Sequence, residues 1–215
     1  QVIYFMQFIC DFHIHSRFAR ATSRQINFKN LDLWAKIKGL RILGTGDFTH
    51  PIWLKEIEEN LEEAEPGLFK LKNQKTKVRF ILTSEISCIY QKNDGVKKIH
   101  LILFAPDIQS VKEINKEFSK FTNLKIDGRP IINLDAKEVL RIISVANPNI
   151  YVACAHIWTP WFSIFGSRSG FNSIEECFEE LTPKIFALET GLSANPEMCW
   201  RVSDIDNFPL ISNSD

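Results

Sequence analysis

Short apolar runs alternate with segments of helical amphipathic character along most of the chain. The apolar runs are unbroken or alternate with polar residues, as buried strands do. They are residues 3–15, 41–46, VRFILTSEISCIY, VKKIHLILFAP, IYVACAH, IFALET and FPLISNSD. Asn93, Asp94 and Gly95 join the third and fourth runs and are typical of a hairpin turn. Repeated strand and helix units predict an α/β fold with a mostly parallel sheet or barrel.

Helical spacing and capping residues predict the helices between these strands. Apolar residues recur at helical spacing over residues 31–40, and Gly39 suits the end of that helix. An acidic helix is predicted over residues 53–64, where Pro66 and Gly67 stop it. A short helix is predicted near residues 196–205, and three more follow the capping residues Asp107, Asp135 and Ser173.

All five histidines lie in settings that suit metal ligands, in or beside the apolar runs, and acidic residues lie in similar places. In barrels of parallel strands, the chemistry collects at the carboxyl ends of the strands. The residues expected there are His15, Asp47, Glu85, His156, Glu189 and Asp215. The pattern predicts one metal site with several ions, built from the ends of several strands.

His13 and His15 form an H-x-H pair, whose side chains face the same way on a strand. Two satisfied histidines on a half-buried strand are the alternative. Glu85 lies within an apolar run, where a carboxylate is costly unless it is paired or bound to a cation, and no Lys or Arg adjoins it in sequence. Asp47 and His50 follow a strand in a glycine-containing loop, although Asp47 alone is more typical of a turn or cap. Mixed nitrogen and oxygen ligands suit Zn²⁺ or Mn²⁺ better than Ca²⁺.

The composition fits one large folded domain. The chain has 215 residues, is 45% hydrophobic and 24% charged, and carries 26 basic and 26 acidic residues. The bulk charge therefore argues neither for nor against a nucleic-acid partner. Five cysteines without a C-x-x-C pair predict a reducing, cytoplasmic location rather than a disulfide framework. No apolar stretch approaches the ~18 residues of a transmembrane helix, so no membrane partner is expected.

Several sequence features resemble, in order, the motifs of the polymerase and histidinol phosphatase (PHP) family. They are DFHIHS, GTGDFTHP, the isolated Glu85, His100, His156 and the terminal NSD. The resemblance covers nearly the whole chain and implies a distorted seven-stranded β/α barrel with a trinuclear metal site. Residues 1–215 would form this PHP metallophosphoesterase domain, as a fragment that is truncated at its last strand and lacks C-terminal domains.

The resemblance also implies which residues hold each ion. The first ion would be surrounded by His13, His15, Glu85 and Asp215. The second would be held by Glu85, His100 and His156, with Glu85 bridging the two ions. A third would be held by Asp47 and His50, and the family's further ligand to it is a histidine two positions past the last aspartate. The residues expected to act in catalysis, with a metal-activated hydroxide as the attacking group, are Glu85, Asp47 and Asp215.

Four longer segments resemble one branch of the family, a group of DNA-repair nucleases. They are HSRFARATS, GTGDFTHPIWL, AHIWTPWFSIFGSRSGF and ALETGLSANPEM. Enzymes of this branch nick DNA on the 5′ side of deaminated bases, such as uracil and hypoxanthine, and of abasic sites. The resemblance therefore implies a metal-dependent DNA-repair endonuclease that binds damaged DNA, with replication or repair proteins as further partners. The expected cofactors are up to three divalent ions, Zn²⁺ and/or Mn²⁺, with Mg²⁺ as an alternative.

Residues beside the expected site are candidates for contacts with the substrate. They are Arg17, Arg20, Arg168, Trp158, Ser193 and Asn213. Arginine can hold a phosphate through two parallel hydrogen bonds, and an aromatic ring can stack on a base. The alternatives are solvated loop arginines, an aromatic loop packed over the barrel mouth, and polar caps at strand ends.

Two other functions fit the same set of ligands. One is a small-molecule phosphoesterase of the histidinol phosphatase type, and the other is a PHP module that binds metal without catalysis. The arginines and the aromatic loop favour a polymeric substrate over a small one. The near-complete set of ligands favours an enzyme over a purely structural module.

Overall fold

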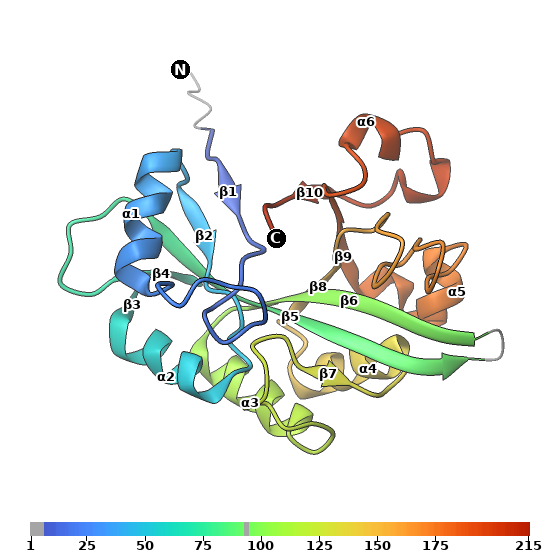
Figure 1. Cartoon of the computed structure of the whole chain (residues 1–215), viewed down its shortest axis with the longest axis horizontal. Coiled ribbons are helices and arrows are strands. Elements are labelled where there is room, and N and C mark those ends of the chain that lie inside the picture. The colour runs from blue at the N-terminus through green and yellow to red at the C-terminus, as the bar shows by residue number, and fades with distance from the viewer. Residues whose placement is uncertain (1–6, 93–94) are drawn as a thin grey trace.

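The chain folds into a nearly closed barrel of seven strands with helices packed around it (Figure 1). The computed structural model describes residues 7–92 and 95–215. In spatial order the barrel strands are β1 (Cys10–Asp11), β2 (Ile42–Gly44), β5 (Arg79–Lys92), β6 (Gly95–Ala105), β8 (Tyr151–Cys154), β9 (Ile185–Thr190) and β10 (Leu210–Ser212). This arrangement confirms the predicted α/β fold with a distorted seven-stranded barrel.

One strand breaks the parallel order of the barrel. The pairs β1–β2, β2–β5, β8–β9 and β9–β10 are parallel, whereas β6 is antiparallel to both β5 and β8. The reversal arises because β5 and β6 form one long hairpin, in which Lys92 pairs with Gly95. Such a short connection can join only antiparallel strands. The predicted hairpin is therefore confirmed by the pairing, although Asn93 and Asp94 themselves lie outside the described residues.

The helices cover the outer face of the barrel. They are α1 (Phe28–Lys38), α2 (Pro51–Asn60), α3 (Ile108–Phe118), α4 (Ala136–Ala146), α5 (Ile174–Phe178) and α6 (Pro196–Cys199), with 3₁₀ turns η1 (Glu179–Lys184) and η2 (Ser203–Ile205). Figure 1 shows α1 and α2 at one side, α3 and α4 beneath the long β5–β6 hairpin, and α5 near its far end. Asp107, Asp135 and Ser173 each accept a backbone N–H at the start of a helix, and Gly39 ends α1 at φ 74°, as predicted.

The predicted acidic helix over residues 53–64 is wrong at its carboxyl end. Helix α2 stops at Asn60, and residues Leu61–Glu65 form strand β3. This strand pairs antiparallel with β4 (Leu68–Leu71), which in turn pairs with β5. The physical reason is burial, because the small sheet places Leu61, Phe69 and Leu71 in the core while the glutamates of β3 stay in solvent. Tertiary packing here outweighs the helical propensity of the acidic residues.

The first predicted strand is much shorter than residues 3–15. Only Cys10 and Asp11 form ladder pairs, with β2, and residues 3–6 lie outside the described part of the chain. Next to β1, individual hydrogen bonds rather than a strand ladder join the first segment of the barrel to the last. The amide of Phe12 donates to Asn213 Oδ1 at 2.7 Å, and the amide of Asp215 donates to the His13 carbonyl at 3.0 Å. Figure 1 accordingly shows the C-terminus beside the end of β1.

The barrel has an outer and an inner apolar cluster. The larger lies between the sheet and the helices, and its largest fully buried side chains include Trp53, Phe28 and Phe80. The smaller fills the barrel interior and consists of Ile102, Phe104, Ala153, Ala155 and Ala187. No helix within the described residues is long and apolar enough to cross a membrane, and all five cysteines are free thiols.

Candidate metal centre

Strand alternation places a polar layer on top of the inner apolar cluster. Side chains alternate between the two faces of a strand, so His100 faces the same way as Ile102 and Phe104 of β6. Glu85 of β5 lies opposite Ile102 in the hairpin, which turns its carboxylate into the barrel. The side chain of Glu85 is fully buried. The interior is therefore closed below by hydrocarbon and lined above by ionisable groups.

Three side chains from two segments, His13, His15 and Asp215, gather around Glu85 at one end of the barrel. The Nε2 atom of His13 lies 3.5 Å from Glu85 Oε1 and 3.5 Å from Asp215 Oδ1. The Nε2 atom of His15 lies 3.3 Å from Glu85 Oε2 and 3.3 Å from Asp215 Oδ1. One ligand atom from each of His13, His15, Glu85 and Asp215 lies within 4.8 Å of all the others. This spacing matches the first ligand group implied by the sequence.

A second group shares the same glutamate. His100 Nδ1 lies 2.6 Å from Glu85 Oε1, and His156 Nε2 lies 3.2 Å from the same oxygen. The ligand atoms of Glu85, His100 and His156 also lie within 4.8 Å of one another. Glu85 thus belongs to both groups, which is the position of a bridging carboxylate.

Unsatisfied nitrogen atoms show that these residues fit divalent cations. Within the described part of the chain, Nε2 of His13 and Nε2 of His15 are buried and have no hydrogen-bond partner. A buried imidazole nitrogen without a partner is costly, and a cation among the two histidines and the two carboxylates would satisfy it. Imidazole and carboxylate donors at this spacing suit Zn²⁺ or Mn²⁺.

The opposite nitrogen of each of these rings is held by a carboxylate. His13 Nδ1 lies 2.9 Å from Glu189 Oε2, and His15 Nδ1 lies 2.9 Å from Asp47 Oδ1. Glu189 also accepts the amide of His156 at 2.7 Å and the Asn213 side-chain amide at 2.7 Å. Metal-binding histidines are commonly oriented by carboxylates in this way. Glu189 and Asp47 therefore set the direction in which the free Nε2 atoms point.

The electrostatics of the centre follow from its concentration of carboxylates. Burial lowers the pKa of His13, but Glu189 and Glu85 outweigh it and raise the pKa to about 10. Burial likewise lowers the pKa of His15, but Asp215, Asp47 and Glu85 raise it to about 12. Burial alone would raise the pKa of Glu85, yet the surrounding histidines, His100 foremost, hold it well below its usual range. Burial lowers the pKa of His100, so the protonated rings of His13 and His15 supply the positive charge that the carboxylates require in the metal-free protein.

Asp47 and His50 are not part of either group. Both oxygens of Asp47 are used, one by His15 and the other by the amide of Ser16 at 2.6 Å. The ring of His50 stacks on Phe18 with centroids 4.2 Å apart, and its Nδ1 is buried without a partner among the described residues. Burial lowers the pKa of His50, which keeps it neutral. The structure therefore gathers the ligands expected for two ions, while Asp47 and His50 lie outside these groups and Asp47 contacts His15 of the first group.

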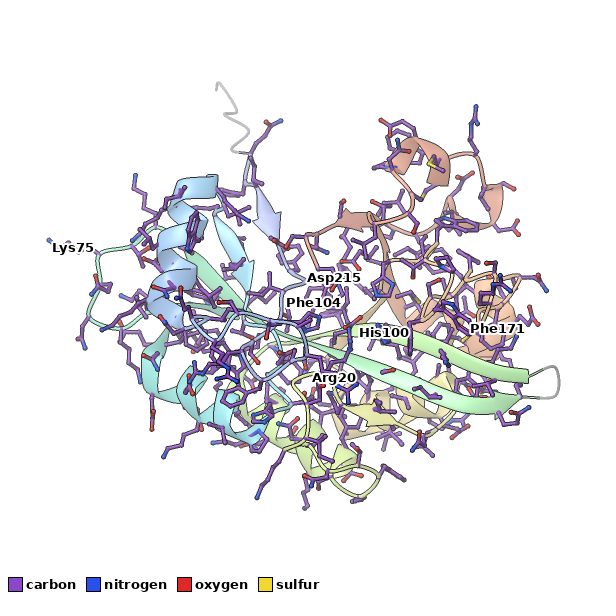
Figure 2. The ribbon with its side chains drawn as sticks, in the orientation of Figure 1. Arg20, Lys75, His100, Phe104, Phe171 and Asp215 are labelled. Carbon is purple, nitrogen blue, oxygen red and sulfur yellow. The ribbon has the colours of Figure 1, made fainter. Side chains whose placement is uncertain are left out.

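Of the arginines predicted to bind substrate, only Arg20 lies at the mouth of the centre. It lines a cavity of about 550 Å³ together with His15 and Asp215. Figure 2 shows Arg20, His100 and Asp215 close to one another near the middle of the molecule. Arg17 instead pairs with Glu56 and donates to the Ile26 carbonyl at 2.8 Å, while its guanidinium lies over the rings of Phe18 and Trp53. Arg168 is exposed in a separate small hollow lined by Gly95 and Ser167, among others.

The other predicted substrate contacts have different surroundings. Trp158 is partly buried and stacks on Phe165 with centroids 4.6 Å apart. Ser193 is exposed in the turn that joins Gly191 to Ala194. Asn213 is committed to Glu189 and to the amide of Phe12. Trp158 and Asn213 therefore pack and orient neighbouring groups in this structure.

Sequence patterns gave no indication of Arg129. Its Nη1 lies 2.9 Å from Glu85 Oε2, so a guanidinium from a loop forms an ion pair with the shared glutamate. The loop, Asp127-Gly128-Arg129-Pro130, lies outside every apolar run and every motif considered above. Only its turn-forming composition is visible in the sequence, and that composition carries no information about the partner of the arginine.

Comparisons with known proteins relate the fold of this barrel to that of a metal-dependent phosphoesterase. No family model matches the chain. The structure of a putative metal-dependent phosphoesterase from Bifidobacterium adolescentis superposes with a TM-score of 0.56 over 97% of this chain and 87% of its own, at 12% identity, and so shows the fold alone.

Much higher similarity connects the chain with endonuclease Q. The lesion-specific endonuclease Q of Pyrococcus furiosus has a TM-score of 0.83 and 31% identity over 97% of this chain. An endonuclease Q complex with a 27-mer duplex substrate, with an abasic lesion at the active site, has a TM-score of 0.82 and 30% identity over 96%. The chain is a PHP-type relative of endonuclease Q, as its motifs predicted, and both kinds of structural neighbour are hydrolases.

The similarity spans only part of the related proteins. The chain covers 48% of each endonuclease Q chain. The uncharacterized protein MJ0043 of Methanocaldococcus jannaschii is 34% identical over 134 residues, which are 62% of this chain and 14% of that protein.

Proposed function

We propose that this chain is the PHP metallophosphoesterase domain of a DNA-repair endonuclease. The enzyme hydrolyses the phosphodiester on the 5′ side of a deaminated base, such as uracil or hypoxanthine, or of an abasic site. The main support is the pair of ligand groups that share Glu85, in a chain 31% identical to a lesion-specific endonuclease. Damaged DNA is the proposed partner, together with replication or repair proteins, and the cytoplasm is the proposed location.

The proposed cofactors are Zn²⁺ and/or Mn²⁺, with Mg²⁺ as an alternative. One ion would be held by His13, His15, Glu85 and Asp215, and a second by Glu85, His100 and His156. A third would draw on His50, whose Nδ1 is buried without a partner among the described residues, and on Asp47 after it releases its present contacts. Such ions, when bound, supply a water that ionises near neutral pH and neutralise charge on the phosphoryl group.

The chain's own side chains position these components. Glu85 Oε2 faces His15 of the first group, and Oε1 faces both His13 of the first group and His100 of the second, so this carboxylate links the two sites. Asp47 and Glu189 fix the histidine rings, and Asp215 closes the open side of the first group. The apolar cluster beneath keeps bulk water from the inner side, which strengthens every electrostatic interaction above it.

An exposed aromatic surface beside the centre offers a place for an unstacked base. Trp161 is 48% exposed, and the Lys98 ammonium lies 4.7 Å from its ring centroid. Its neighbour Phe162 lies against His100, with ring centroids 4.6 Å apart. Bases stack on such rings without regard to sequence. We propose Trp161 for this contact, since Trp158 is already stacked on Phe165.

A nicking assay with the full-length protein tests the proposal. An end-labelled duplex that carries one deoxyinosine, deoxyuridine or abasic site is incubated with Mn²⁺, Mg²⁺ or Zn²⁺, beside an undamaged duplex. The expected result is a single nick just 5′ of the lesion, absent from the undamaged duplex and from the Glu85→Ala variant. If no metal supports lesion-dependent nicking, the proposal fails. Hydrolysis of histidinol phosphate would then favour the small-molecule phosphoesterase.

A further inference from the structure

The mouth of the metal centre holds Arg129, whose guanidinium contacts the carboxylate that both ligand groups share. Arg129 Nη1 contacts Glu85 Oε2 at 2.9 Å. The Arg129 side chain is 33% exposed, whereas that of Glu85 is fully buried. One edge of the guanidinium therefore faces Glu85, and part of the side chain stays accessible from the adjoining cavities.

The backbone that carries Arg129 is tightly fixed against the centre. Gly128 accepts a hydrogen bond from the Thr49 hydroxyl at 3.1 Å and donates its amide to the Phe18 carbonyl at 3.0 Å. A Cβ atom on Gly128 would lie 2.3 Å from Asp47 Oδ2, so only glycine allows this approach. The Pro130 carbonyl accepts the amide of Ser87 at 3.0 Å. The main chain of the loop is thus anchored on both sides of Arg129, and its side chain extends from a rigid base.

Two cavities meet at this side chain. Arg129 and Arg20 both line the cavity of about 550 Å³ that contains His15 and Asp215. The same two arginines line a second cavity of about 270 Å³ that contains His100. The Arg20 side chain is 88% exposed, and its Nε lies 3.6 Å from Asp127. An anion that approaches either ligand group through these cavities would therefore meet both guanidinium groups.

Divalent cations would change the partner of Arg129. Glu85 Oε2 faces His15 as well as Arg129, so an ion held by the first ligand group takes the oxygen that the guanidinium now contacts. A guanidinium has five N–H donors and no acceptor, and it matches the geometry of phosphate with paired hydrogen bonds. Once a cation coordinates the Glu85 carboxylate, the Arg129 guanidinium needs a new partner, and an oxyanion such as a phosphate suits it best.

We propose that Arg129, together with Arg20, forms an anion subsite that holds non-bridging oxygens of a phosphodiester against the metal centre. This inference rests on the phosphodiester chemistry proposed above and assigns a substrate contact to a residue outside the ligand set. The phosphate would lie between the two arginines and the cations, which together balance its charge. Arginine rather than lysine suits this position, because the planar guanidinium presents two parallel N–H donors to a phosphate and an ammonium group does not.

Phosphate binding tests the subsite separately from nuclease activity. Inorganic phosphate is titrated calorimetrically into the full-length, Mn²⁺-loaded protein, and the bound metal is counted in each sample. Arg129→Gln is expected to weaken phosphate binding by about 10- to 100-fold, as loss of a charge-assisted hydrogen bond does. Arg129→Lys should fall between the two. Arg41→Gln, which removes a charge at the amino end of β2, serves as the control and should match the wild type.

Each outcome decides the matter. Weaker phosphate binding by Arg129→Gln with unchanged metal content supports the subsite, whether or not the enzyme nicks lesions. Equal phosphate affinity in wild type and Arg129→Gln overturns it, as does failure of the loaded wild type to bind phosphate. Loss of metal from Arg129→Gln also overturns it, because the arginine would then act only on Glu85. A negative nicking assay with intact phosphate binding refutes the proposed function and leaves the subsite standing.

Discussion

Loading the metal-free protein with Mn²⁺ near neutral pH should displace about two protons. The pKa of His13 is about 10 and that of His15 about 12 in the metal-free protein, so both imidazoles are protonated at pH 7.5. A metal ligand must be a neutral imidazole, and each ring therefore loses its proton when the ion binds. His50 adds none, since burial lowers its pKa and it is already neutral.

The magnitude follows from linkage between the proton and metal equilibria. Release of about two protons makes the apparent association constant rise roughly 100-fold per pH unit while both rings are charged. Protonation of His13 and His15 weakens metal binding but stabilises the folded state of the metal-free protein. Both pKa values exceed the usual 6.5, so this contribution to the free energy of unfolding is complete below about pH 6.5. It is lost as the pH rises through about 10 for His13 and about 12 for His15.

Calorimetry measures the number of protons directly. Mn²⁺ is titrated into metal-free protein at one pH in buffers with different ionisation enthalpies, and the slope of observed enthalpy against buffer enthalpy gives the protons released. Glu189→Gln is the matched control, because removal of that carboxylate from His13 should lower the pKa and bring the release toward one. A slope near zero in the wild type, with full metal binding, would refute the assignment of charged histidines to this centre.

Three further perturbations test the surroundings of the centre. Asp47→Asn should lower metal affinity about 10- to 100-fold, because Asp47 orients His15, and it should also remove the proposed third ion. A metal affinity and an ion count both equal to those of the wild type would contradict these roles. Gly128→Ala should destabilise the fold by about 1–3 kcal/mol in urea denaturation, because the added methyl overlaps Asp47 Oδ2; wild-type stability would contradict the close approach. Phe104→Ala should cost about 3–5 kcal/mol by emptying the barrel interior, and a midpoint within error of wild type would show that Phe104 does not support the centre.

Several parts of the centre were predictable because strand geometry is periodic. A carboxylate within the apolar run around Glu85 needs a charged partner, and the structure supplies histidines and Arg129 within 3.5 Å. His13 and His15 are separated by one residue, and both Nε2 atoms face Glu85. The two ligand groups that the resemblance implied are the groups that lie together in the structure. Local sequence patterns can predict such contacts where the strand fixes the direction of the side chain.

Other parts depended on long-range packing that local patterns do not encode. Asp47 stays a predicted ligand, and its contacts with His15 and the Ser16 amide arise from the loop after β2, whose course the sequence pattern does not encode. The antiparallel course of β6 follows from its hairpin, which the turn residues indicated but the α/β repeat did not. Arg129 reaches Glu85 only because Gly128 lets its loop approach Asp47, and no periodicity marks such a contact. Strand β3 likewise forms because β4 is there to pair with it.

The barrel closes between segments that are far apart in the chain. The bond between Phe12 and Asn213 joins residues 201 positions apart, and His13 and Asp215 lie beside it in one ligand group. Closing so long a loop costs more conformational entropy than closing the short loop of the β5–β6 hairpin. A cation bound by both His13 and Asp215 would hold these two segments together where the barrel closes, here called the seam. Metal loading should therefore slow the opening of the seam far more than it slows fluctuations in the β5–β6 hairpin, and amide exchange at Phe12 and Asp215 would report it.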